Sequence, residues 1–136
     1  MVSIPGPSVI PDRVLAAMNR PMPNIYEGDL IEVSFSVQDD LRKIARTERP
    51  VFISVSNGHG AWEMAISNTL SRGDKVLVLE SGTFAVGWGE MAEVSGVKAE
   101  ILSGSDPDPV NPEALEERLK ADVAKEITAV MVVQVD

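Results

Sequence analysis

Apolar and polar positions alternate in blocks along the chain, and the blocks predict strands and helices in turn. Short, nearly continuous apolar runs are typical of buried strands, whereas apolar residues spaced three and four apart indicate one face of a helix. From residue 51 onward the two patterns follow each other. The expected strands are 51–56, 75–80, 97–102 and 127–135, and the expected helices are 58–70, 84–95 and 113–125.

The first part of the chain has a different pattern. Residues 1–12 are rich in proline and glycine, and a short helix is expected at 13–19, before Pro21 and Pro23. A longer helix with one apolar face is expected at 29–47. We therefore expect an extended arm with a short helix over residues 1–28 and an incomplete α/β domain over residues 29–136.

Strands that alternate with helices predict an α/β fold with a mostly parallel sheet and helices on both faces. The run at 127–135, ITAVMVVQV, is apolar enough to lie in the middle of such a sheet. Since the chain stops directly after it, we expect a further segment or a partner to cover it. Ligands of these folds bind at the carboxyl ends of the strands.

The turn after the first of these strands reads Ser-Asn-Gly-His-Gly at residues 56–60. Asn57 is a suitable N-cap, and the free N–H groups of a helix N-terminus favour an anion such as phosphate. It is not a dinucleotide fingerprint, because a third glycine is missing, and not a P-loop, because no Gly-Lys-Ser/Thr follows. These residues alone leave open a second interpretation, in which glycine serves only the packing of strand and helix.

The composition argues against several classes of partner and of metal site. With 21 acidic and 12 basic side chains, the net charge of −9 argues against nucleic acid or an anionic membrane as the main partner. The absence of cysteine and the single histidine argue against thiolate and multi-histidine metal sites. The acidic segment 106–108 is interpreted as a turn, because it lacks the spacing of a calcium loop. Without an apolar run of membrane length or a signal peptide, we expect a cytoplasmic protein.

Several short motifs, in this order and spacing, resemble the N-terminal part of the class V pyridoxal-phosphate aminotransferases, which include serine–glyoxylate and alanine–glyoxylate aminotransferases. The resemblance covers essentially the whole chain, and family members are longer. The motifs are Pro5-Gly6-Pro7-Ser8, Pro11-Asp12-Arg13-Val14, Ser56-Asn57-Gly58-His59-Gly60-Ala61-Trp62-Glu63, Asn68-Thr69-Leu70, Gly73-Asp74-Lys75-Val76-Leu77 and Gly82-Thr83-Phe84.

The resemblance implies a partial large domain of PLP fold type I, with pyridoxal 5′-phosphate as the cofactor. It assigns Asn57, Gly58 and His59 to the cofactor phosphate and the ring of Phe84 to the face of the pyridine. It also places Gly6 near the substrate. The alternatives are that Phe84 is a core residue and that the segment around Gly6 is a rigid arm docking on a partner. A homodimer is the family's usual assembly.

No catalytic residue is assigned to this chain. The lysine that forms the Schiff base in the family comes after the point where this chain stops, and none of its five lysines matches it. Asp136 is expected near the site, without being the acidic partner of the pyridine nitrogen. At residues 23–26, where many relatives carry a His-Arg pair, this chain has Pro-Asn-Ile-Tyr, which leaves the substrate open.

The expected activity of the full-length protein is transfer of an amino group from a small amino acid, serine or alanine, to a 2-oxo acid such as glyoxylate. Another PLP chemistry, desulfuration or decarboxylation, stays open because it shares the same phosphate site. A third possibility is that the chain is a non-catalytic α/β fragment or binding module.

Overall fold

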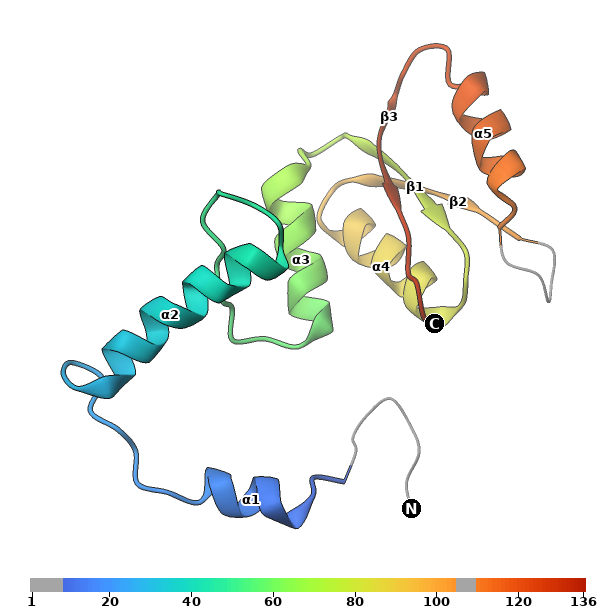
Figure 1. Cartoon of the computed structure of the whole chain (residues 1–136). Helices are drawn as coiled ribbons and strands as arrows, with labels where there is room; N and C mark the ends of the chain where they lie inside the picture. Colours follow the sequence, from blue (N-terminus) through green and yellow to red (C-terminus); the bar gives the residue numbers. More distant parts are fainter. Residues whose placement is uncertain (1–8, 105–109) are drawn as a thin grey trace. The chain divides into compact units, whose positions relative to one another are not determined.

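The computed structural model describes residues 9–104 and 110–136, so Gly6 and the acidic segment 106–108 lie outside the described residues. The chain divides into two compact units, Met1–Ile53 and Ser54–Asp136. Figure 1 shows the helices and strands of each unit. The division expected after residue 28 stays a prediction.

The first unit contains two helices, α1 (Asp12–Met18) and α2 (Asp29–Ile44). Acidic residues lie in the first turn of α2 and basic residues in its last turn, an order that favours the helix dipole. Both expected helices are confirmed, although α2 ends three residues earlier than predicted. Neither helix has a buried residue, so the apolar face of α2 is exposed within the described structure.

The second unit is a three-stranded parallel sheet with helices, and it confirms the expected α/β class. The strand order is β2-β1-β3, so β1 is paired on both edges. Val76, Leu77 and Val78 of β1 have no exposed surface. The elements in chain order are α3 (Gly58–Thr69), β1 (Lys75–Leu79), α4 (Thr83–Val94), β2 (Lys98–Leu102), α5 (Pro112–Ala121) and β3 (Ile127–Met131).

The strand expected at 51–56 is wrong, because these residues adopt no regular secondary structure. Phe52 and Val55 are strongly exposed, at 84% and 104%. A strand needs a neighbouring edge for its backbone hydrogen bonds. Both edges of β1 are taken by β2 and β3, and the segment joins neither outer edge of the described sheet. An apolar run without a free partner edge therefore does not form a strand.

The prediction for the last strand was also wrong in part. β3 ends at Met131 instead of residue 135, and it lies at an edge of the described sheet while β1 takes the middle. Met131, which pairs with Val78, is the last residue of β3 with a partner on β1.

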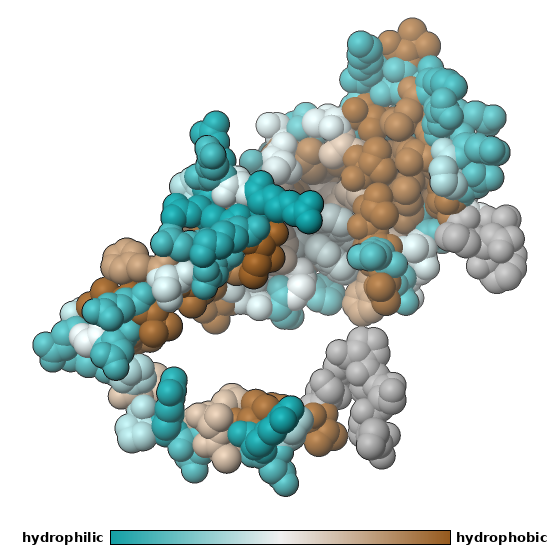
Figure 2. All heavy atoms as spheres, in the orientation of Figure 1, coloured by the Kyte–Doolittle hydropathy of each residue, from teal (hydrophilic) through white to brown (hydrophobic). Residues whose placement is uncertain are grey.

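Helix α4 covers one face of the sheet. The main core cluster lies between this face, α4 and the end of α3, and consists of Ile66, Val76, Val78, Ala85, Ala92, Val97 and Met131. Helix α5 lies on the opposite face. Val76 and Ala99 belong to the α4 face, and side chains alternate along a strand, so their neighbours Leu77 and Glu100 point to the other face. There Glu100 binds α5. That second face is only partly covered: Figure 2 shows an apolar area over the strands beside α5.

Glu100 ties α5 to the sheet through two cations. Its carboxylate accepts hydrogen bonds from Arg118 of α5, one at 2.7 Å, and pairs with Lys75 of β1 at 2.7 Å. Hydrogen bonds from Arg118 and Lys75 lower the pKa of Glu100 from 4.5 to about 2. A carboxylate whose folded pKa is depressed stabilises the fold above its unfolded pKa, and this stability is lost as the pH falls through the folded pKa.

We predict that Glu100→Gln lowers the free energy of unfolding by about 1 kcal/mol at pH 7, a value discounted because the three side chains are partly exposed. The difference from the parent should shrink as the pH falls from about 4.5 towards 2. Urea denaturation at several pH values measures it. Glu116→Gln, which removes an exposed ion pair with Lys120, is the control and should change little. An equal loss at every pH would contradict the assignment.

Candidate functional site

The N-termini of α3 and α4 lie at the carboxyl end of the sheet. Helix α4 follows β1 directly, whereas α3 precedes β1, so that the C-terminus of α3 leads to the start of β1. The rings of His59 and Phe84, one from each helix start, have centroids 6.2 Å apart. This is the edge at which open α/β sheets bind ligands.

The first turn of α3 contains two free donors. Asn57 is the N-cap, as predicted, and its side-chain oxygen accepts the N–H of Gly60 at 3.1 Å. Its carbonyl oxygen accepts the N–H of Ala61 at 3.2 Å. Within the described part of the chain, the N–H groups of Gly58 and His59 have no hydrogen-bond partner. No acidic residue lies in this turn, so the positive end of the helix dipole is not neutralised locally.

The two glycines of the turn serve different purposes. A Cβ atom on Gly60 would lie 2.6 Å from the Cβ of Ser56, which is too close for the turn to keep its shape. A Cβ atom on Gly58 would meet no atom within 4 Å. Gly60 is therefore required by the turn itself, whereas Gly58 leaves open space beside the free N–H groups.

Aromatic side chains from α3 and α4 pack together next to these donors. The ring of Trp62 lies 4.8 Å from His59, 6.0 Å from Phe84 and 5.4 Å from Trp88, with which it is stacked. Phe84 is 46% exposed and His59 is exposed, so both rings are accessible to a ligand. The two helices thus bring Asn57, Gly58, His59 and Phe84 to one place.

The N-terminus of α4 is occupied, in contrast to that of α3. The carboxylate of Asp136 accepts the N–H groups of Phe84 and Ala85, each at 2.8 Å, and lies 3.2 Å from the hydroxyl of Ser81. Sequence reasoning placed Asp136 near the site but missed these bonds. The signal in the sequence was Gly82. As an N-cap residue without a side chain, it cannot accept the first N–H groups of α4, so the acceptor has to come from another part of the chain.

The lysines of β1 and β2 are not part of this constellation. Lys75 and Lys98 begin their strands, at the opposite end of the sheet, and Lys75 is paired with Glu100. Lys120 pairs with Glu116 on α5.

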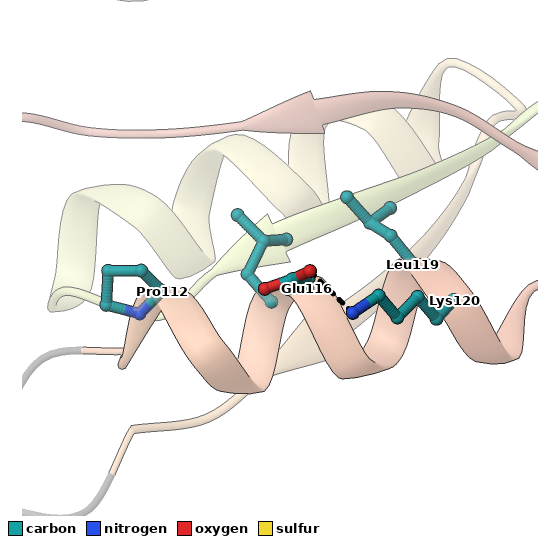
Figure 3. Close-up of a pocket in the computed structure, with 5 residues that line it drawn as sticks. Pro112, Glu116, Leu119 and Lys120 are labelled. Atoms are coloured by element: carbon teal, nitrogen blue, oxygen red, sulfur yellow. Dashed lines mark ion pairs between the residues drawn. The ribbon is translucent and has the colours of Figure 1, made fainter.

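A separate hollow on α5 is not a candidate for the same chemistry. Figure 3 labels four of the residues that line it, among them Leu119 and the ion-paired Glu116 and Lys120. All five lining residues belong to one helix, and the charged pair is already neutralised.

Among the described residues, no helix has both the length and the apolar character to cross a bilayer.

The residues at the start of α3 and α4 fit a phosphorylated aromatic group such as pyridoxal phosphate. Two unpaired N–H groups and the dipole of α3 suit the phosphate, and the space beside Gly58 allows it to approach the backbone. The exposed ring of Phe84 offers a face or edge to a conjugated ring.

The chain resembles several aminotransferases. It is 39% identical over 131 residues to a serine–glyoxylate aminotransferase of Methylorubrum extorquens, a match that covers 96% of this chain and 33% of the relative. An L-aspartate–glyoxylate aminotransferase of Paracoccus denitrificans is 32% identical over 96% of this chain and 33% of its own length. The crystal structure of an alanine–glyoxylate aminotransferase from Nostoc matches with a TM-score of 0.70 and 30% identity, over 86% of this chain and 31% of that one. No family model matches the chain.

These matches confirm the resemblance. Over most of its length the chain is similar to serine–glyoxylate and alanine–glyoxylate aminotransferases, and its fold matches part of the fold of an alanine–glyoxylate aminotransferase. It spans about a third of the length of the relatives it matches.

The different roles of the two glycines predict different stabilities. Gly60→Ala should lower the thermal midpoint of the ligand-free chain, because the new methyl group clashes with Ser56. Gly58→Ala should leave the midpoint unchanged or raise it slightly, since alanine favours the helix and meets open space. Thermal unfolding followed by circular dichroism measures both. If the two variants lose stability equally, Gly58 serves the turn as Gly60 does.

Proposed function

We propose that this chain is the cofactor-anchoring part of a pyridoxal-phosphate-dependent aminotransferase. The whole protein would transfer an amino group from a small amino acid, serine or alanine, to a 2-oxo acid such as glyoxylate. The observation that carries the proposal is the open N-terminus of α3 next to the exposed ring of Phe84. The names of the homologues support the reaction class.

Each residue of the site has a physical role in this proposal. The N–H groups of Gly58 and His59 hold the phosphate, and Asn57 fixes the turn by capping Gly60. Phe84 fixes the tilt of the pyridine ring. The bound cofactor supplies an electron sink for the amino acid, and this chain supplies anchoring and orientation.

The substrate and assembly are also proposals. Relatives are named for serine and for L-aspartate, and we propose serine or alanine as the donor here. Gly6, which lies outside the described residues, is proposed to contribute backbone near the substrate. We also propose a homodimer and a cytoplasmic location. Analytical ultracentrifugation of the full-length protein tests whether it is a dimer.

The binding proposal is tested with pyridoxine 5′-phosphate, which has the ring and phosphate but no aldehyde to react with surface lysines. We expect it to bind and to change the fluorescence of Trp62 and Trp88, which are the two tryptophans of the chain. Pyridoxine without phosphate is the control and should bind far more weakly. Gly58→Val should weaken binding by obstructing the phosphate, and Phe84→Ala by about 1 kcal/mol, the scale of a lost aromatic stack.

Equal affinity for the two ligands would show that the phosphate is not recognised. If the parent binds pyridoxine 5′-phosphate and Phe84→Ala binds it equally well, then Phe84 is a packing residue. Binding that survives Gly58→Val unchanged would place the anion elsewhere.

The chain alone should not transaminate. In the described structure, Lys75 and Lys98 lie at the far end of the sheet from the proposed site. We expect no turnover above that of free pyridoxal phosphate when the chain is mixed with cofactor, serine and glyoxylate. Turnover above this background would contradict the prediction, because one of the chain's own lysines would then serve the reaction.

A further inference from the structure

Two helix N-termini meet at the same edge of the sheet, but only one of them is open. At α3 the N–H groups of Gly58 and His59 lack partners in the described structure. At α4 the first-turn N–H groups of Phe84 and Ala85 are held by a carboxylate that is more than 50 residues away in sequence. An anion arriving at this edge therefore meets free donors only on α3.

The contact between Asp136 and α4 is specific in geometry. Both carboxylate oxygens are used, one for the N–H of Phe84 and the other for that of Ala85. Gly82 faces the carboxyl directly, and a Cβ atom there would lie 2.7 Å from its Cγ. The backbone of Gly82 has φ +156°, which also favours glycine. The turn before α4 is therefore shaped to admit this side chain.

We propose that Asp136 is a positioning residue of the cofactor site: it fixes the start of α4, and with it the ring of Phe84. This inference rests on the proposed function, and it assigns Asp136 a role that acts through Phe84 instead of through contact with the reacting atoms.

Electrostatics support this role. A carboxylate at a helix N-terminus takes up the positive end of the dipole, so a second anion at α4 would meet a like charge. Loss of surrounding water raises the pKa of Asp136, but hydrogen bonds from Phe84, Ala85 and Ser81 together lower it below its ordinary value. The group is therefore ionised at neutral pH.

The test compares two ligands on the same chain. Inorganic phosphate needs only the N-terminus of α3, whereas pyridoxine 5′-phosphate also needs the ring of Phe84. We expect Asp136→Asn, which keeps one acceptor oxygen, to lower the ratio of the affinity for pyridoxine 5′-phosphate to that for phosphate by about two- to tenfold. Isothermal titration measures both affinities. A general loss of fold would weaken both ligands together and leave the ratio unchanged.

Asp122→Asn is the matched control. Asp122 also accepts two backbone N–H groups, those of Glu126 and Ile127, but it does so at the start of β3, at the opposite end of the sheet. Its replacement should lower the thermal midpoint without changing the affinity ratio. A double-mutant cycle completes the design: in the Phe84→Ala background, Asp136→Asn should no longer change the ratio, because the ring it positions is gone.

The outcomes separate the inference from the function on which it rests. If the parent chain binds neither ligand, the proposed function fails and the role of Asp136 fails with it. If the parent binds and Asp136→Asn leaves the ratio unchanged, the positioning role alone is overturned. A lowered ratio that persists in the Phe84→Ala background also overturns it, since Asp136 would then act by another route.

Discussion

The pairing of β1 on both edges is the constraint on which the rest of the second unit depends. Three consecutive residues of β1 are fully buried, so the strand has to be covered on both faces as well as paired on both sides. Because all three strands are parallel, the helix before β1 and the helix after it both begin at the carboxyl edge. The sheet therefore places two helix N-termini side by side before any functional residue is considered.

What distinguishes these two helix ends is a single charged side chain. Asp136 neutralises the start of α4, and no acidic residue does the same in the first turn of α3. Two similar helix ends thus differ in charge: we propose that the start of α3 binds an anion, whereas the start of α4 is already neutralised and carries the ring of Phe84. Gly58 and Gly82 also differ in their surroundings. A Cβ atom on Gly58 would face open space, whereas a Cβ atom on Gly82 would meet the side chain of Asp136.

Local patterns allowed much of this to be predicted. The helix α3 with its cap Asn57, the helix α4 and the strands β1 and β2 follow from apolar spacing and capping rules that act within a few residues. The segment 51–56 and the end of β3 were predicted wrongly, because strand formation depends on a partner edge that periodicity does not report. The bonds of Asp136 were missed for the same reason, since they join residues 51 and 52 positions apart.

We propose that a phosphate binds at the start of α3 and not at the start of α4. Amide chemical shifts during a titration with pyridoxine 5′-phosphate test it residue by residue. We predict that the largest changes fall on the N–H groups of Gly58 and His59, which lack partners in the described structure. The amides of Phe84 and Ala85 should shift much less, because Asp136 holds them. Larger shifts at Phe84 and Ala85 than at Gly58 and His59 would instead place the phosphate at α4 and contradict this proposal.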